Sequence, residues 1–304
     1  MFKKCFILLF IIAFVSTPTF AANTCQKDGL WLQVLGSGGP ELDDGRASSG
    51  YVIWSEGKAR FVIDLGSGSM FQFEQSGASI NDIEAIMLSH MHVDHSNDLP
   101  ALIKASFFSN RTHNLPLFGP TGNEFMPSLE SYVDSLFGSD NGAYQYLSSY
   151  LDGNDAYRLL PHNVDVTKQK EEVVLVNSQY KLTAIPVHHG EIPALAWRID
   201  LAGKSIVFSG DMSNNYNTLA RLAKQADLLV AHNAVPERVK GVARNLHMPP
   251  SVIGQIAEQA KVKQLVISHR MKRTLGQEDA SLANIRKAYK GPVMFADDLQ
   301  CFSI

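Results

Sequence analysis

The sequence has no surplus of basic residues. Its 304 residues include 27 lysines and arginines against 30 aspartates and glutamates, a net charge of −3 with neutral histidines. Proteins hold nucleic acids largely through lysine and arginine contacts that release counterions from the phosphates. The composition therefore predicts that nucleic acid is not a partner.

The apolar run at the N-terminus is too short to cross a membrane. It covers residues 5–15, against the about 20 residues that a transmembrane helix needs. It follows Lys3 and Lys4 and precedes small residues that end at Ala21, a pattern typical of a cleaved secretory signal. We therefore predict a signal peptide over 1–21 and a periplasmic or secreted protein without stable membrane anchoring. The mature chain keeps 25 basic residues against 30 acids, a net charge of about −5.

Cysteine is scarce, with three residues in the chain. Cys5 leaves with the predicted signal, so Cys25 and Cys301 remain near the two ends of the mature chain. In an oxidising compartment such a pair is typical of one disulfide, and two unpaired buried thiols are the alternative. Both lie too far along the chain from the histidine-rich motif to be assigned as metal ligands.

Internal repeats, low-complexity tracts and linkers are absent, which favours one domain over residues 22–304. Strand-like runs between glycine-rich turns predict an antiparallel sheet in the first third, and from residue 205 onward strands alternate with helices. Together these patterns predict an α/β fold of two sheets between outer helical layers. The expected strands include 31–35, 51–54, 61–63, 205–209, 227–231 and 264–268, and the expected helices are 216–226 and one that begins at Pro250.

The segment 124–165 differs from the rest of the chain. It is aromatic and rich in serine and glycine, with short helical patterns. We predict either a cap over the active-site pocket or an ordinary surface insertion.

One short motif concentrates potential metal ligands. His90, His92, Asp94 and His95 follow a strand-like run over 83–88. Imidazole and carboxylate groups suit Zn, Fe or Mn, and alternating side chains let the first two histidines reach one metal while Asp94 and His95 turn toward another. A chance H-x-H-x-D-H at a strand end is rare, so the motif predicts a metal centre.

This motif resembles that of the metallo-β-lactamase superfamily, and specifically the branch that contains ribonuclease Z and the zinc arylsulfatases. The resemblance covers nearly the whole mature chain, with segments in the family's order and spacing. It implies the family's αββα sandwich of two mixed sheets flanked by helices. The segments are 35–40 with Arg46 and Ser49, 63–68, 90–95, 119–122, 208–211 and 265–269.

The resemblance also implies a binuclear centre, with two Zn²⁺ per chain as the first expectation and Mn²⁺ or Fe as alternatives. His189 is preferred to the adjacent His188 because it lies eight residues before Trp197 in the family's Trp-Arg-Ile pattern. For Asp211 the alternative is a helix N-cap, and for His269 a structural role. Carried over residue by residue, the first metal takes His90, His92 and His189, the second takes Asp94, His95 and His269, and Asp211 bridges them.

Three residues are expected to act in catalysis: Asp94, His232 and Arg273. His232 lies where ribonuclease Z carries a His-Glu-Ala-Thr motif, but Asn233 replaces the glutamate, so the proton relay of that motif is altered. His232 is either the general acid or a hydrogen-bond partner of a ligand. Arg273 matches a family arginine that can face a sulfate or phosphate oxygen, or it belongs to a solvated charge run. His247 is expected to be structural or to support a ligand.

Two metals that share a water can hydrolyse many esters and amides. Acidity, predicted secretion and the lack of an evident insertion for gripping transfer RNA argue against transfer-RNA processing, and Asp211 counts against a β-lactamase. We therefore expect a hydrolase of small sulfate esters or phosphodiesters, of arylsulfatase or phosphodiesterase type, that uses a metal-bridging hydroxide. A lactonase-type acyl hydrolase and a catalytically weak zinc-binding protein are the alternatives. The expected partners are a small-molecule ester and, by resemblance, a second copy of the chain in a homodimer.

Overall fold

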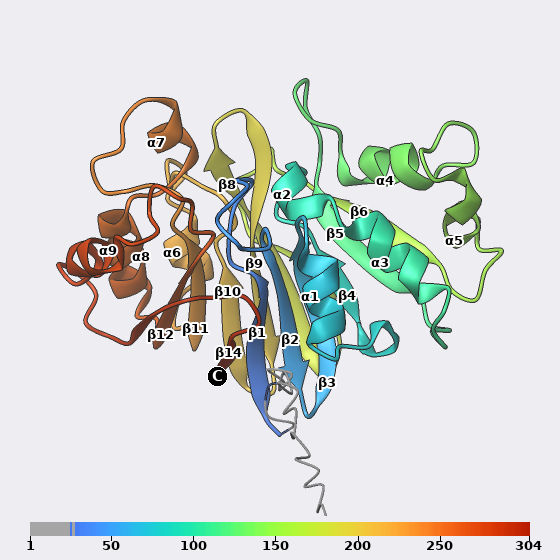
Figure 1. The fold of residues 1–304 in the computed structure, drawn as a ribbon, viewed down its shortest axis with the longest axis horizontal. Coiled ribbons are helices and arrows are strands. Elements are labelled where there is room, and N and C mark those ends of the chain that lie inside the picture. The colour runs from blue at the N-terminus through green and yellow to red at the C-terminus, as the bar shows by residue number, and fades with distance from the viewer. Residues whose placement is uncertain (1–24, 26–27) are drawn as a thin grey trace, which may run out of the picture.

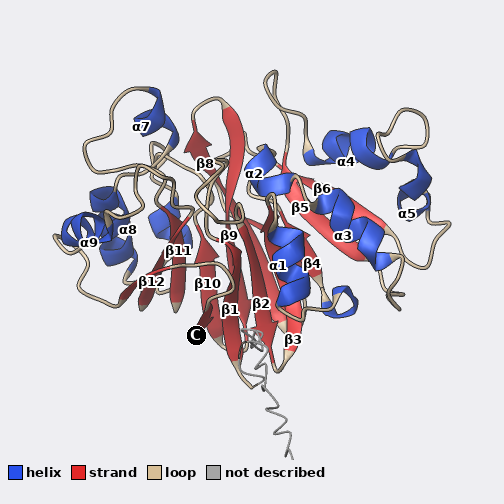
Figure 2. Ribbon diagram, in the orientation of Figure 1, coloured by secondary structure: helices blue, strands red, loops and turns tan. Residues whose placement is uncertain are grey.

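The computed structural model describes residue 25 and residues 28–304. The predicted signal peptide 1–21 lies outside the described residues. Figures 1 and 2 show two β-sheets packed face to face with helices on their outer sides. Within the described part of the chain, no helix is long and apolar enough to cross a membrane. The arrangement confirms the predicted αββα sandwich.

The first sheet is antiparallel on one side and parallel on the other. β14, β1, β2 and β3 pair antiparallel, whereas β3, β4, β5 and β6 pair parallel. The expected antiparallel sheet therefore ends at β3, because the chain crosses over through helices before β4 and β5, and such crossovers join parallel strands. The strands, in sheet order, are β14 (Cys301–Ser303), β1 (Leu30–Gly36), β2 (Gly50–Ser55), β3 (Lys58–Leu65), β4 (Ala85–Met87), β5 (Leu115–Pro120) and β6 (Leu159–Val164).

The second sheet repeats this division. β7 to β10 form antiparallel hairpins, and β10 to β13 are parallel. The parallel strands β10, β11 and β12 lie within one residue of the three strands that the sequence predicts after residue 204. The strands, in chain order, are β7 (Glu172–Val176), β8 (Tyr180–His189), β9 (Ile192–Leu201), β10 (Lys204–Phe208), β11 (Leu228–His232), β12 (Gln264–Ser268) and β13 (Val293–Phe295).

Hydrophobic side chains fill three layers. Leu32 and Phe61 from the first sheet meet Trp197 and Phe208 from the second in a core between the sheets. Each outer sheet face packs on helices, with Val52 in one of these outer clusters. Because Tyr51 and Val52 point to opposite faces, both faces of β2 are buried. The covering helices are α1 (Ser69–Gln75), α3 (Leu99–Ser106) and α4 (Leu129–Phe137) on one side, and α6 (Leu219–Leu222), α8 (Pro250–Ala260) and α9 (Glu278–Ile285) on the other (Figure 1).

The segment 124–165 contributes α4, the short helices η2 (Gln145–Leu147) and α5 (Ser149–Asp152), and β6. Its buried side chains, such as Val133 and Phe137, join the outer core of the first sheet. Just before it, Asn123 Nδ2 donates to Glu191 O at 2.7 Å, at the turn between β8 and β9. The helices therefore pack beside β5 and β6, and a cap over bound substrate stays a prediction.

A disulfide joins the two ends of the described chain. Cys25 and Cys301 are bonded across a separation of 276 residues. Cys301 lies in β14 opposite Gln33 of β1. Of the two alternatives for these cysteines, the structure therefore contains the disulfide.

Candidate metal centre

The seven predicted ligands lie at one rim of the sandwich, where strands from both sheets end. In Figure 1 this rim carries α2 (Val93–Ser96) and the end of β8. Side chains that follow the carboxyl ends of parallel strands meet at one edge of a sheet, which brings together residues far apart in sequence. Ligands follow β4 (His90, His92, Asp94 and His95), end β8 (His189), follow β10 (Asp211) and follow β12 (His269).

The first donor group is His90, His92 and His189. His92 Nδ1 lies 2.9 Å from His90 Nε2 and 3.4 Å from His189 Nε2. These ring nitrogens lie within 4.8 Å of one another, close enough to share one metal ion. The neighbouring His188 faces away and pairs with Ser213 Oγ at 2.7 Å.

The second donor group gathers around Asp211. His269 Nε2 lies 3.4 Å from Asp211 Oδ1 and 3.2 Å from Asp94 Oδ2. His95 Nε2 lies 3.7 Å from Asp211 Oδ2 and 3.5 Å from Asp94 Oδ2. Asp211 Oδ2 is also 3.9 Å from His189 Nε2, so this carboxylate faces both groups. The arrangement matches the predicted bridging position, and the ligand assignment itself stays a prediction.

His247 is a further histidine of the centre, which the sequence led us to place outside the ligand set. It follows α7 (Val242–Leu246), and its Nδ1 lies 3.7 Å from Asp211 Oδ2. With His189 and Asp211 it forms a third group of potential ligands. No local motif of the H-x-H-x-D-H kind surrounds His247, so only the fold brings it to the centre.

Hydrogen bonds hold the ligand rings in place. Asp64 Oδ2 accepts from His95 Nδ1 at 2.8 Å, and its other oxygen accepts from the Ser89 backbone N–H at 2.7 Å. His189 Nδ1 donates to Leu246 O at 2.9 Å. Such partners fix the ring orientation and raise the basicity of a metal-binding histidine. Asp64 lies within the segment 63–68 that carries the family resemblance, yet the sequence did not mark it as part of the centre.

His232 lies behind Asp211 with both ring nitrogens engaged. Its Nδ1 is 2.8 Å from Asp211 Oδ1, and its Nε2 is 3.0 Å from the Tyr51 hydroxyl. Burial lowers the pKa of His232, and an ionised carboxylate only accepts hydrogen bonds, so Nδ1 donates to Asp211, while the Tyr51 hydroxyl donates to Ser268 Oγ at 2.9 Å. The structure therefore places His232 as a hydrogen-bond partner of a ligand, the second of the two roles that the sequence left open.

The protonation of the centre suits a cation. Burial lowers the pKa of His189 to about 4, which leaves a neutral ring with a free lone pair. Burial also opposes ionisation of Asp211, but the neighbouring histidines His269 and His247 outweigh it and hold its pKa well below the usual range. For His95 the carboxylates of Asp94 and Asp64 overcome the effect of burial and raise the pKa. Surroundings that draw a proton onto a buried imidazole also favour a metal ion there.

An unsatisfied polar atom supports the fit of a metal. His95 Nε2 is buried and has no hydrogen-bond partner, although it faces Asp94 and Asp211. A buried nitrogen without a partner costs free energy, which a coordinated cation would offset. The glycine-rich loop after β1 makes room beside the ligands, because a Cβ at Gly39 would lie 2.9 Å from His269 Cε1. The donor set therefore fits a binuclear site of imidazoles and carboxylates, and the identity of the metal stays a prediction.

Arg273 lies beside the centre with a restrained side chain. Its Nε donates to Ala234 O at 2.6 Å, two residues after His232. Its positive charge contributes to lowering the pKa of His247, after the larger effects of burial and His269, to about 3. The hydrogen bond to Ala234 O ties the guanidinium to the segment that follows His232.

Comparisons with known proteins also relate this chain to the metallo-β-lactamase superfamily. The model for the family described as Beta-lactamase superfamily domain matches residues 59–270. Ribonuclease Z from Mycobacterium sp. (strain KMS) is 28% identical over 279 residues, which cover 88% of this chain and 93% of that protein. Human tRNase Z, short form, has a TM-score of 0.69 and 20% identity over 90% of this chain and 99% of its own. The metallo-beta-lactamase fold protein YhfI from Bacillus subtilis also has a TM-score of 0.69, with 20% identity over 91% of this chain and 99% of its own.

Two predictions from the sequence are wrong. We expected a hydrolase of small sulfate esters or phosphodiesters, with a lactonase or a zinc-binding protein as alternatives, but the relatives that match most of the chain are named ribonucleases. The expected absence of a nucleic-acid partner fails on the same finding. The error has a physical cause: net charge averages over the whole surface, whereas a nucleic acid needs cations only where it binds.

The family match and the donor groups make this protein a metal-dependent hydrolase with a binuclear site. The chain belongs to the metallo-β-lactamase superfamily, in the branch that contains ribonuclease Z.

Proposed function

We propose that this protein hydrolyses phosphodiester bonds in RNA with two divalent metal ions, zinc being the first candidate. The observation that carries the proposal is the complete His and Asp donor set around Asp211, in a chain that matches relatives named ribonuclease Z along 88% of its length. Phosphodiester hydrolysis is the chemistry that such paired sites serve well, because the attacking and leaving oxygens both carry negative charge.

The residues divide between two positions. His90, His92 and His189 would hold one ion, Asp94, His95 and His269 the other, and Asp211 both. When bound, the two ions supply a water of lowered pKa and stabilise the charge on the phosphate oxygens. Asp94 is ionised because His95 and the hydrogen bond from His269 outweigh burial and lower its pKa, so it would offer the second position an anionic ligand.

His247 is the residue we assign to protonate the leaving oxygen. His232 cannot take that role, since Asp211 and Tyr51 occupy both of its ring nitrogens and 2% of the residue is exposed. His247 is 8% exposed and faces Asp211 from the other side. Its pKa of about 3 makes the ring neutral in the free protein. A phosphate anion between His247 and Arg273 would raise that pKa and draw a proton onto the ring.

Arg273 orients the phosphate in this proposal. Its Nε is held by Ala234 O and one Nη by Met271 Sδ, while the other Nη has no hydrogen-bond partner among residues 28–304. A guanidinium presents planar donors that match two phosphate oxygens. Its charge would complement a phosphate bound beside the metal ions.

The direct test is cleavage of a labelled transfer-RNA precursor and of an unstructured RNA by zinc-loaded protein. We expect cleavage of RNA that depends on added metal and is lost in Asp211→Asn. Cleavage of the precursor at one position would favour a transfer-RNA substrate, and scattered products would favour a general ribonuclease. Intact RNA after incubation with protein that carries two metals per chain would overturn the proposal.

A further inference from the structure

Tyr51 places a polar group in the core between the two sheets. It lies in β2, is 0% exposed, and packs its ring against Phe208 of β10 with the ring centroids 5.3 Å apart. Phenylalanine would fill the same space without burying a hydroxyl, and a buried hydroxyl costs free energy unless it is hydrogen-bonded. The partners of this hydroxyl therefore show what tyrosine adds at this position.

The Tyr51 hydroxyl reaches from the first sheet to two strand ends of the second. It donates to Ser268 Oγ at 2.9 Å and lies 3.0 Å from His232 Nε2, within hydrogen-bond distance. His232 ends β11, Ser268 ends β12, and the two residues are paired in the register of these parallel strands. One side chain of β2 thus contacts the second sheet at the rim that carries Asp211 and His269.

His232 connects this hydroxyl to the predicted bridging ligand. Its Nδ1 lies 2.8 Å from Asp211 Oδ1, and its backbone N–H donates to Ser209 Oγ at 3.1 Å. Because the two ring nitrogens are fixed relative to each other, the contacts at Nδ1 and Nε2 together set the orientation of the imidazole. A carboxylate that serves two ions must turn one oxygen toward each, so the ring that holds Oδ1 of Asp211 also constrains the direction of Oδ2.

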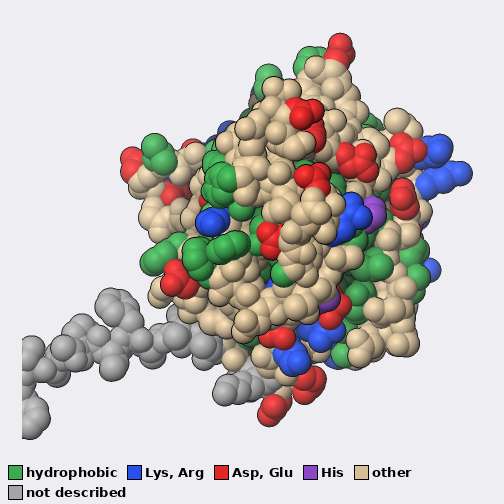
Figure 3. Space-filling model, turned by 90° about the vertical axis from the view of Figure 1, so that its right-hand side faces the viewer, with side chains coloured by type: hydrophobic (Ala, Val, Ile, Leu, Met, Phe, Trp, Pro, Cys, Tyr) green, Lys and Arg blue, Asp and Glu red, His purple; other side chains and the backbone are tan. Residues whose placement is uncertain are grey.

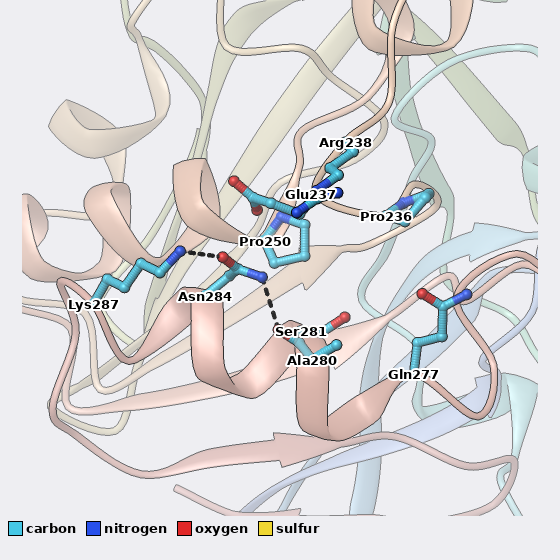
Figure 4. Close-up of a pocket in the computed structure, with 9 residues that line it drawn as sticks. All are labelled: Pro236, Glu237, Arg238, Pro250, Gln277, Ala280, Ser281, Asn284 and Lys287. Carbon is cyan, nitrogen blue, oxygen red and sulfur yellow. Dashed lines mark hydrogen bonds between the residues drawn. The ribbon is translucent and has the colours of Figure 1, made fainter.

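Tyr51 is too deeply buried to contact a substrate. Tyr51, His232 and Asp211 are all buried. None of the three lines the cavity that Figure 4 shows, although the segment 236–238 of that cavity begins four residues after His232. Any effect of Tyr51 on the metal centre must therefore pass through the residues that it contacts.

We propose that Tyr51 is a positioning residue, which holds His232 and through it keeps Asp211 in the orientation that binds both metal ions. The inference rests on the proposed function, in which Asp211 holds both ions. It adds a second task for the first sheet, which supplies the ligands after β4 and would also orient a ligand that the second sheet carries. Without the hydroxyl, the His232 ring would lose its contact at Nε2, and Asp211 would be held less firmly.

Tyr157 provides a matched control. It is 3% exposed, and its hydroxyl is 2.6 Å from Ser106 Oγ, so Tyr157→Phe also removes a buried hydroxyl that pairs with a serine. Its ring packs on Tyr150 of α5 in the outer core of the first sheet. Helix α5 lies on the side of the molecule that Figure 3 turns toward the viewer, and Tyr157 contacts no residue of the donor groups through its hydroxyl.

The test compares metal binding by the wild-type chain, Tyr51→Phe and Tyr157→Phe. The affinity for Zn²⁺ is measured by competition with a chromophoric chelator, and the ligand geometry by the visible absorption of the protein loaded with Co²⁺. We expect Tyr51→Phe to bind one of the two ions about tenfold more weakly, the lower end of the range for groups that contact a ligand directly, because Tyr51 acts through one further residue. The Co²⁺ spectrum of Tyr51→Phe should change, and Tyr157→Phe should match wild type in both measurements.

A second comparison tests the route through His232. In a chain that already carries His232→Gln, adding Tyr51→Phe should reduce the affinity for Zn²⁺ by less than about twofold, because coupled residues are not additive. A full additional loss in that double variant would overturn the positioning role. So would wild-type affinity and an unchanged Co²⁺ spectrum in Tyr51→Phe. If Tyr51→Phe does not fold, Tyr51→Phe/Ser268→Ala replaces it with the same expectation, because that chain leaves no serine hydroxyl without its donor.

Kinetics and metal binding together separate this inference from the proposed function. With bis-p-nitrophenyl phosphate, Tyr51→Phe should lower kcat by about tenfold and leave KM near that of wild type, because the hydroxyl contacts no substrate. An increase in KM at unchanged kcat would overturn the inference. Wild-type protein that binds two ions but does not cleave RNA would overturn the proposed function, while the affinity for Zn²⁺ would still decide the role of Tyr51.

Discussion

Asp211 is the residue at which the donor groups meet. Its two oxygens lie within 3.9 Å of His95, His189, His247 and His269, and its Oδ1 also accepts from His232. The loop that carries it includes Gly210 with a φ of 58°, where a Cβ would lie 2.9 Å from Ser89 Cβ. The Asp211 side chain is therefore held by histidines from several elements, and the turn before it packs against Ser89, which follows β4.

The first prediction concerns metal content. Asp211→Asn keeps the shape of the side chain but removes the charge that faces both donor groups. We expect the bound metal to fall from two ions per chain toward one, as measured by atomic emission spectroscopy after dialysis. Asp64→Asn serves as a comparison: among the proposed ligands its carboxylate contacts His95 alone, and its loss should weaken metal affinity by about 10- to 100-fold. Two tightly bound ions in Asp211→Asn would contradict the bridging role.

The second prediction separates the roles of His247 and His232. His247→Gln should lower kcat for RNA by about 10²- to 10⁴-fold, the usual contribution of a general acid. It should affect bis-p-nitrophenyl phosphate much less, because nitrophenolate leaves without a proton. His232→Gln should slow both substrates alike, since His232 acts by holding Asp211. A leaving-group dependence in His232→Gln and none in His247→Gln would reverse this assignment.

Arg111 shows how single residues join elements. It lies between α3 and β5, with 2% of the residue exposed and no carboxylate partner among the described residues. Its Nη1 donates to Ile80 O at 2.6 Å and Ile83 O at 2.8 Å, and its Nη2 donates to Asn114 O at 2.9 Å. The guanidinium thus ties η1 (Ile80–Asp82) and the entry to β4 to the start of β5.

The third prediction concerns the contribution of Arg111 to stability. Arg111→Met leaves three carbonyl oxygens without their donor and should lower the free energy of unfolding by about 2–4 kcal/mol. Chemical denaturation should show a lower midpoint at an unchanged slope, because the surface exposed on unfolding is similar. Arg111→Lys should recover part of the loss. Equal stability of the methionine variant and wild type would show that these hydrogen bonds add nothing net.

The elements around the centre differ in how well the sequence predicts them. Apolar periodicity predicts strands β10, β11 and β12 and helix α8, because their apolar residues recur at the spacing of a strand or of a helix. The expected helix over 216–226 shrinks to α6, Leu219–Leu222. Asn217 and Gln225, near the two ends of that range, adopt positive φ values of 52° and 56°, which a helix does not permit. Apolar spacing alone gave no sign of that turn.

At the scale of the whole molecule, the disulfide joins the start of the described chain to β14. It closes a loop of 276 residues, so it restricts the unfolded chain strongly. The predicted signal peptide would deliver the protein to an oxidising compartment, and both the cleavage after residue 21 and the periplasmic location stay predictions. So does the homodimer.

The fourth prediction tests this covalent link. Cys25→Ser should lower the free energy of unfolding by about 2–4 kcal/mol, the usual loss when a native disulfide is removed. A reductant should lower the melting temperature of the wild-type protein to that of the Cys25→Ser variant. The same reductant should not lower the melting temperature of the variant further. The metal content should remain that of wild type, because Cys25 lies outside the donor groups. A melting temperature unaffected by either change would contradict a stabilising role.

The sequence by itself determined the metal chemistry and the layered fold. The close spacing of potential ligands in His90–His95 predicts a metal centre. The two sheets between helical layers follow from the apolar patterns of the strands and helices. Tertiary structure decided what surrounds that centre. Asp64, Tyr51 and His247 come from separate strands and loops, so no local pattern could connect them with His95, His232 and Asp211. Charge shows the same division, because a sequence sums its lysines and acids, whereas only folding decides where on the surface the cations lie.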